Sequence, residues 1–121
     1  DWSYHGPNVA QWQESYASAA LADYNNDGTL DLFFTTVYGG DYARLYRNDG
    51  NWNFSNVTDS EGLGGQPSTY QGAWADYDND GDQDLLTAGT LYRNNTTGNN
   101  WLKIEMVGDG HIQHIAKHRD G

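Results

Sequence analysis

The chain has 121 residues, with 17 acidic and 6 basic side chains, a formal net charge of −11 and no cysteine. This acidity excludes nucleic acid as a partner, because nucleic acids are bound mainly through Lys and Arg, and no run of about 18 apolar residues is present to insert into a membrane. Leu, Ile, Val and Phe make up only about 16% of the chain, as in disordered proteins. Aromatic residues reach 14%, however, which indicates a folded domain. A cation bound among the carboxylates would reconcile the two signals.

Two segments of the chain repeat each other. Residues 20–32 read Ala-Leu-Ala-Asp-Tyr-Asn-Asn-Asp-Gly-Thr-Leu-Asp-Leu, and residues 73–85 read Ala-Trp-Ala-Asp-Tyr-Asp-Asn-Asp-Gly-Asp-Gln-Asp-Leu, at an offset of 53 residues. A second repeated motif, Leu-Tyr-Arg-Asn, follows each segment at residues 45–48 and 91–94, at an offset of 46 residues. The two copies differ in length only in the connection between the two motifs. We therefore interpret the pattern as a duplicated structural unit.

Each unit divides into four strand-like runs that are separated by Asp, Asn and Gly. The runs cover residues 17–23, 30–37, 43–47 and 54–58 in the first unit, and residues 70–76, 84–88, 90–93 and 101–107 in the second. Asp49-Gly50 predicts a hairpin between the third and fourth runs of the first unit. Four short strands per repeat predict an all-β fold of two four-stranded antiparallel blades of the β-propeller type.

This pattern divides the chain into four parts. We expect an N-terminal segment at residues 1–14, a first blade at 15–62, a second blade at 63–108 and a C-terminal tail at 109–121. Two blades cannot close a ring that normally holds four to eight.

The connection between the first and second strands of each blade has the composition of a metal-binding loop. Oxygen side chains stand at positions 1, 3, 5 and 9, and Gly stands at position 6. A hard cation such as Ca²⁺ takes six to eight oxygen ligands from a sharply turning loop, in which position 7 offers its backbone carbonyl. Because N and S ligands are missing, Zn²⁺ and Cu are disfavoured. The side chains are those of Asp23, Asn25, Asp27 and Asp31 in the first loop, and of Asp76, Asp78, Asp80 and Asp84 in the second.

An EF-hand and a solvated turn are the two other interpretations of these loops. An EF-hand requires a bidentate Glu at position 12, where this chain has Phe34 and Thr87. Solvated turns explain single clusters of Asp, Asn and Gly, but two copies in the same register, each gathering like charges, favour metal binding.

The two repeated sequence motifs resemble the FG-GAP and VCBS repeats, which are similar to the calcium-binding blades of integrin α-subunit propellers. The segments Asn100-Trp101-Leu102-Lys103-Ile104 and Arg119-Asp120-Gly121 resemble the start of an ASPIC/UnbV segment. The resemblance implies an extracellular propeller, stabilised by calcium, that serves adhesion or ligand recognition. It also implies two Ca²⁺ sites, with backbone ligands at Thr29 and Asp82 and side-chain ligands at Asp23, Asn25, Asp27, Asp31, Asp76, Asp78, Asp80 and Asp84.

Three further patterns suggest roles at the surface. Sequons at Asn53, Asn56, Asn94 and Asn95 are candidates for glycosylation. His111, His114 and His118 have the spacing of one helical face, which would suit a metal-dependent hydrolase. Five Trp and nine Tyr supply either the core or a surface for stacking sugars.

Taken together, these patterns predict a secreted or cell-surface calcium-binding module, and not an enzyme. Its expected partners are other propeller blades, further copies of itself, or a protein or carbohydrate ligand. The first hypothesis is a part of a larger adhesive propeller. The second is a structural subunit that stacks blade on blade into an oligomer or filament.

Overall fold

The computed structural model describes residues 16–38, 40–96, 100–107 and 111–119, with side chains as far as residue 96. The predicted N-terminal segment, residues 1–14, lies outside them. In the described part the chain forms strands and turns, and no helix in it is suited to crossing a membrane. The strands are β1 (Tyr16–Ala22), β2 (Asp31–Thr36), β3 (Arg44–Asn48), β4 (Phe54–Asn56), β5 (Gly72–Ala75), β6 (Asp84–Thr87), β7 (Thr90–Tyr92), β8 (Asn100–Val107) and β9 (His111–Arg119).

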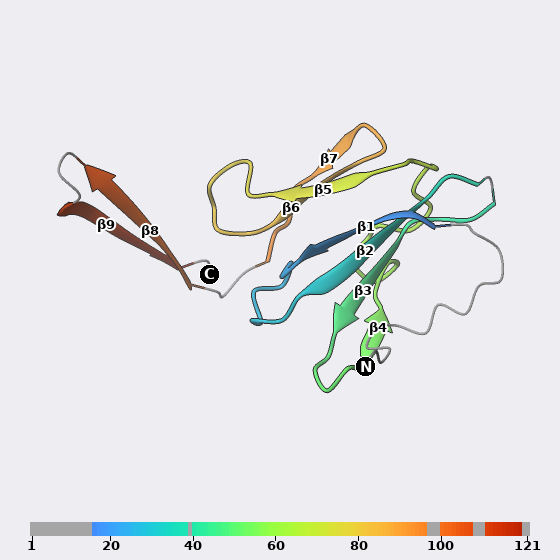
Figure 1. Cartoon of the computed structure of the whole chain (residues 1–121), viewed down its shortest axis with the longest axis horizontal. Helices are drawn as coiled ribbons and strands as arrows, with labels where there is room; N and C mark the ends of the chain where they lie inside the picture. Colours follow the sequence, from blue (N-terminus) through green and yellow to red (C-terminus); the bar gives the residue numbers. More distant parts are fainter. Residues whose placement is uncertain (1–15, 39, 97–99, 108–110, 120–121) are drawn as a thin grey trace, which may run out of the picture.

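The first sheet is an antiparallel meander in the order β1-β2-β3-β4 (Figure 1). Its third and fourth strands are joined at Asp49-Gly50, as predicted, where the amide of Asp49 donates to the carbonyl of Asn53 over 2.8 Å. Gly50 has a φ of 80°, which glycine adopts without the cost of a Cβ clash. The predicted strand positions are confirmed here within one to two residues at most ends, because alternating apolar residues and turn residues specify them locally.

The second sheet has the order β5-β6-β7, one strand fewer than predicted. The run expected as its fourth strand does form a strand, β8, but β8 pairs with β9 over its whole length. β8 and β9 therefore form a two-stranded sheet of their own and do not extend the second sheet. Because β9 is a strand, the helical spacing proposed for His111, His114 and His118 does not apply. The all-β fold with two blade-like sheets is confirmed.

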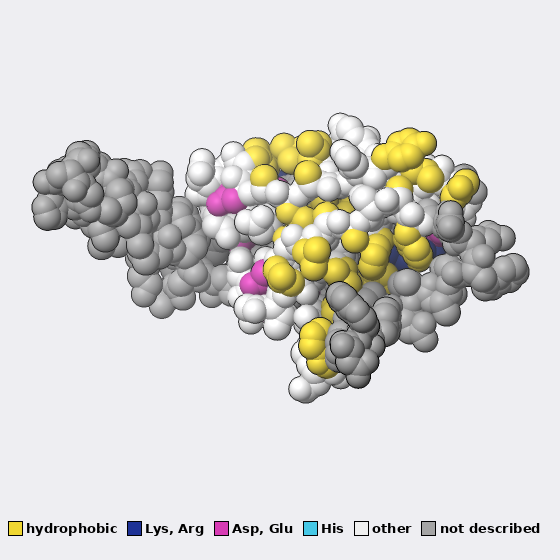
Figure 2. Space-filling model, viewed as in Figure 1, with side chains coloured by type: hydrophobic (Ala, Val, Ile, Leu, Met, Phe, Trp, Pro, Cys, Tyr) yellow, Lys and Arg dark blue, Asp and Glu magenta, His cyan; other side chains and the backbone are white. Residues whose placement is uncertain are grey.

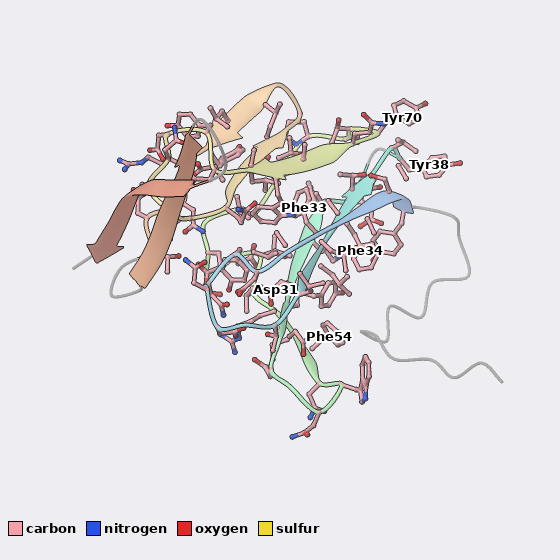
Figure 3. The ribbon with its side chains drawn as sticks, turned by 60° about the vertical axis from the view of Figure 1, so that its left-hand side comes forward. Asp31, Phe33, Phe34, Tyr38, Phe54 and Tyr70 are labelled. Atoms are coloured by element: carbon pink, nitrogen blue, oxygen red, sulfur yellow. The ribbon has the colours of Figure 1, made fainter. Side chains whose placement is uncertain are left out.

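The two sheets pack face to face through β1, β2 and β5. Phe33 is completely buried between them, and its ring packs against the Trp74 ring in a T-shaped arrangement with the ring centroids 6.1 Å apart. Gly72 makes this approach possible, because a Cβ at that position would lie 2.8 Å from Cε1 of Phe33. In Figure 3, Phe33 points toward the second sheet and Phe34 lies on the opposite side of β2. The core consists of Tyr24, Phe33, Ala43, Leu45, Val57, Leu63 and Leu85.

This packing places the β1–β2 loop and the β5–β6 loop at the same end of the two packed sheets, the end that faces the β8–β9 hairpin in Figure 1. Acidic side chains gather at that end in Figure 2. The two predicted metal-binding loops are therefore neighbours.

Candidate metal centre

Both loops turn through the same two residues with positive φ. At position 4, Asn26 and Asn79 have φ values of 56° and 60°, a left-handed conformation that Asn tolerates better than most residues. At position 6, Gly28 and Gly81 have φ values of 90° and 95°, which glycine alone adopts easily. The Asn-Asp-Gly motif, which both loops share, thus specifies the same sharp turn in each copy.

The aspartate at position 1 organises this turn. In the second loop, Oδ1 of Asp76 accepts a hydrogen bond from the amide of Asp80, and Oδ2 accepts one from the amide of Gly81, each over 3.0 Å. The first loop has the same bonds, from the amides of Asp27 and Gly28 to Asp23, over 3.0 and 2.8 Å. The carboxylate therefore folds the loop around itself.

The aspartate at position 9 ties each loop to its sheet. Asp84 is fully buried, and its two oxygens accept from the amides of Tyr77 over 3.1 Å and Asn94 over 2.7 Å. Asp31 is also fully buried and accepts from Tyr24 over 3.1 Å and Asn48 over 2.8 Å. Burial raises the pKa of Asp31, although both amides favour its charged form.

Three carboxylates converge in the second loop. Asp76, Asp78 and Asp84 each offer an oxygen, and these oxygens all lie within 4.8 Å of one another. A cluster made only of carboxylate oxygens matches the preference of a hard divalent cation such as Ca²⁺. Asp80 and Asp82 are not part of this group: Oδ1 of Asp80 accepts the amide of Asp82 over 3.0 Å.

Arg93 is the cationic neighbour of the second loop. Its guanidinium lies 2.7 Å from Oδ2 of Asp78 and 3.0 Å from Oδ2 of Asp80. Burial acts to raise the pKa of Asp80, but the Asp82 amide and Arg93 outweigh it, so that this pKa is lowered. The corresponding Arg47 instead contacts Asp49 at 2.6 Å, a residue that Asn95 replaces in the second copy.

The first loop has two carboxylates fewer, because Asn25 and Thr29 stand where the second loop has Asp78 and Asp82. The Asn25 amide donates to Oδ2 of Asp27 over 3.0 Å, and the Thr29 hydroxyl donates to Oδ1 of Asp27 over 2.5 Å. The hydrogen bond from Thr29 is the main reason that the pKa of Asp27 is lowered. The carboxylate at position 5 is thus held by uncharged partners within its own loop.

Hydrogen bonds also join the first loop to the second repeat unit. Nδ2 of Asn26 donates to Oδ1 of Asp82 over 2.7 Å, and Nδ2 of Asn94 donates to the carbonyl of Tyr24 over 2.6 Å. Asp82, predicted as a backbone ligand, therefore uses its side chain as a contact between the sheets. An ion that orders one loop would also act on the packing of the two sheets.

A family model described as an FG-GAP-like repeat matches residues 23–87, slightly more than half of the chain. The chain belongs to the FG-GAP-like repeat family. FG-GAP-like repeats are structural and ligand-binding modules that often bind calcium and are typical of extracellular proteins. The comparisons with curated proteins and with solved structures gave no match. The resemblance to an ASPIC/UnbV segment concerns residues beyond the match and stays a prediction.

The Leu-Tyr-Arg-Asn motif of the FG-GAP-like repeat has a structural role that was not predicted from the sequence. Asn48 and Asn94, which end Leu-Tyr-Arg-Asn, donate their backbone amides to the buried aspartates at position 9. Their side chains also donate to the carbonyl at position 8, that of Leu30 and that of Gln83, over 3.2 and 3.1 Å. The sequence signal for this role was that the same Leu-Tyr-Arg-Asn motif follows both acidic loops.

The sequons of this FG-GAP-like chain occupy two kinds of position. Asn53, Asn56 and Asn95 are exposed. Nδ2 of Asn94, the atom that a glycan would modify, instead donates to Tyr24 and Gln83. The side-chain oxygen of Asn94 accepts from both the amide and the hydroxyl of Thr96, so this Asn-x-Thr sequence serves as a local turn.

Proposed function

We propose that this chain is an extracellular blade module in which Ca²⁺ stabilises the loops between the first and second strands of each blade. The observation that carries the proposal is the convergence of Asp76, Asp78 and Asp84 in the second loop. We expect the second loop to bind more tightly than the first, because Asn25 replaces a carboxylate there.

The role of the ion in this proposal is structural. Three carboxylates that approach within 4.8 Å repel one another, and a divalent cation would remove this repulsion. Asp84 is also held by Asn94, which contacts Tyr24 in the first sheet. Binding at the second loop would therefore stabilise the packing between the sheets as well as the loop.

Asp78 offers the sharpest test of the site. It is exposed, whereas Asp84 is buried and shapes the loop, so we expect Asp78→Asn to leave the fold intact. The reciprocal change, Asn25→Asp, supplies a carboxylate at position 3 of the first loop. Calcium titration by calorimetry should show weaker binding for Asp78→Asn and tighter binding for Asn25→Asp. Extracellular calcium modules bind at about 10⁻⁴–10⁻³ M, which sets the concentration range.

Two results would contradict the calcium proposal. One is a wild-type chain that releases or absorbs no heat with Ca²⁺ across this range. The other is unchanged affinity in both variants, which would place any bound ion elsewhere. Circular dichroism of each variant checks that the comparison is made between folded proteins.

For adhesion or ligand recognition, we propose the end of the molecule opposite the loops. Tyr38 and Tyr70 point outward there, near each other, in Figure 3. They are 58% and 75% exposed, and aromatic rings of this kind stack on sugars or anchor protein partners. Screening the chain on a glycan array tests the carbohydrate case. Binding that is lost in Tyr38→Ala/Tyr70→Ala supports it, and an array without binding contradicts it.

A further inference from the structure

The contact between the two sheets uses different faces of the repeated unit. The first sheet contributes Phe33, Leu45 and Tyr24 to the buried core. The second sheet contributes Leu85, Trp74 and Tyr92. We call these sets the first-sheet inner face and the second-sheet inner face.

The repeat relates each residue of one sheet to a residue of the other. Strand register confirms the equivalence, because Phe33 pairs with Leu45 in the first sheet, and Leu86 pairs with Leu91 in the second. By the same offsets, Tyr77 corresponds to Tyr24. The outer side of the second sheet therefore carries a second version of the first-sheet inner face.

These outer residues are exposed although their equivalents are buried. Leu86, Leu91 and Tyr77 are 50%, 49% and 49% exposed. Their equivalents, Phe33, Leu45 and Tyr24, are 0%, 1% and 7% exposed. The difference arises because the first sheet is covered by the second, whereas in the described part of the chain the β8–β9 hairpin does not contact the second sheet and no other sheet covers its outer side.

The outer side of the first sheet repeats the second-sheet inner face in the same way. Leu21 corresponds to Trp74, Leu32 to Leu85 and Tyr46 to Tyr92. Leu21 is 56% exposed, and Leu32 and Tyr46 are half-buried. Hydrophobic side chains are visible at the surface over both sheets in Figure 2. The molecule thus presents, on opposite sides, the two halves of the contact that it makes internally.

We propose that a second copy of this chain docks head to tail, with the outer face of its first sheet against the outer face of the second sheet of its neighbour. The intermolecular contact would repeat the contact between the two sheets. Leu21 of one copy would meet Leu86 of the other, as Trp74 meets Phe33 within the chain. The proposal rests on apolar faces and not on calcium, so it is independent of the proposed metal function.

The loops support the same geometry. Within the chain, the Tyr24 carbonyl accepts from Asn94 across the two sheets. The equivalent acceptor is the Tyr77 carbonyl at the open side, and the equivalent donor is Asn48. In the docked pair, Asn48 of one copy would reach Tyr77 of the other. Because the two faces differ, the contact is heterologous, and rings of two, three or four copies would contain the four to eight blades of known propellers.

Complementary variants test the direction of docking. Leu21→Asp places a charge on one outer face, and Leu86→Asp places a charge on the other. Both side chains are half exposed in the single chain, so we expect each variant to retain its fold. Analytical ultracentrifugation should show oligomers for the wild type and monomers for each variant alone. A 1:1 mixture should give a species of twice the monomer mass, because each variant retains the face that the other lacks.

Tyr42→Asp is the matched control, since Tyr42 is 52% exposed in the connection between β2 and β3. It should assemble like the wild type. A monomeric wild type would overturn the proposal, and hydrogen exchange would then show whether a segment of the chain itself protects the two faces. Oligomers of Leu21→Asp alone, or a mixture that stays monomeric, would also overturn it, because neither fits head-to-tail docking.

Discussion

The backbone amide of Asn94 donates a 2.7 Å hydrogen bond to Oδ1 of Asp84, and Asn48 makes the same bond to Asp31 over 2.8 Å. Each bond joins the end of the third strand region to the buried aspartate that closes the loop. The two sequence motifs of the repeat thus form one hydrogen-bonded structure. In the second copy this structure is also bonded to the first repeat unit, because the Asn94 side chain donates to the carbonyl of Tyr24.

Replacement of Asn94 should weaken the packing of the two sheets. Asn94→Ala removes donors to Tyr24 and Gln83 and an acceptor for Thr96. We expect a loss of about 1–3 kcal/mol in the free energy of unfolding, since several hydrogen bonds between partly buried groups are lost and the Tyr24 carbonyl keeps only the bond from the Thr96 hydroxyl. Urea denaturation measures this loss. The neighbouring Asn95→Ala, at an exposed side chain, is the control and should change stability little. Equal effects of the two variants would contradict this role for Asn94.

Gly72→Ala should force the sheets apart. Its Cβ would lie 2.8 Å from the buried ring of Phe33, and overpacking of this kind costs about 1–3 kcal/mol. Phe33→Leu introduces the residue that stands at the equivalent position of the second copy, Leu86. In the double variant the smaller side chain should relieve the clash, so the loss measured by denaturation should be smaller than the sum of the single losses. Additive losses would show that the two residues do not compete for space.

Removal of the Arg93 charge should strengthen calcium binding at the second loop. The guanidinium contacts Asp78 and Asp80 and repels a cation bound there. Because unit charges near a surface interact by about 1 kcal/mol, Arg93→Gln should raise the affinity roughly three- to tenfold in a calorimetric titration. Arg47→Gln is the matched control, since Arg47 pairs with Asp49 instead. An equal gain in both variants would indicate a general charge effect.

The hairpin between β3 and β4 should contribute a pH-dependent increment of stability. Hydrogen bonds from the Ser55 hydroxyl and then from Arg47 lower the pKa of Asp49. A lowered pKa in the folded state stabilises the fold above the ordinary pKa of about 3.9, and this stabilisation is lost as the pH falls through the folded value. The wild type should therefore exceed Asp49→Asn in stability at pH 7, and the difference should vanish in acid. A difference that is constant with pH would contradict the assignment.

Local features made much of this structure predictable. The Asn-Asp-Gly motifs specify the turns at Asn26 and Asn79, and alternating apolar residues specify the strands. The acidic residues could be assigned to loops because the repeat aligned them in two copies. Tertiary choices could not be predicted in this way. The sequence of β8 does not encode whether it pairs with β7 or with β9, because both pairings suit an alternating strand.

Single-residue differences between the copies also had effects that no local pattern predicts. Arg93 turns to the second loop, whereas Arg47 pairs with Asp49, for which the second copy has only Asn95. Likewise, Leu86 and Phe33 occupy equivalent positions, but their burial depends on whether another sheet covers them. Both outcomes depend on neighbours that are distant in the sequence or outside the unit.

Thermal unfolding in millimolar Ca²⁺ and in excess chelator tests the central claim most directly. At a calcium concentration about 10–100 times the dissociation constant, each site should add about 1.4–2.7 kcal/mol, because the ion binds the folded loop. Equimolar Mg²⁺ is the control and should stabilise less, since it demands a tighter octahedral shell. The account predicts a melting temperature several degrees higher in calcium than in chelator or Mg²⁺. Superimposable melting curves in all three conditions would contradict it.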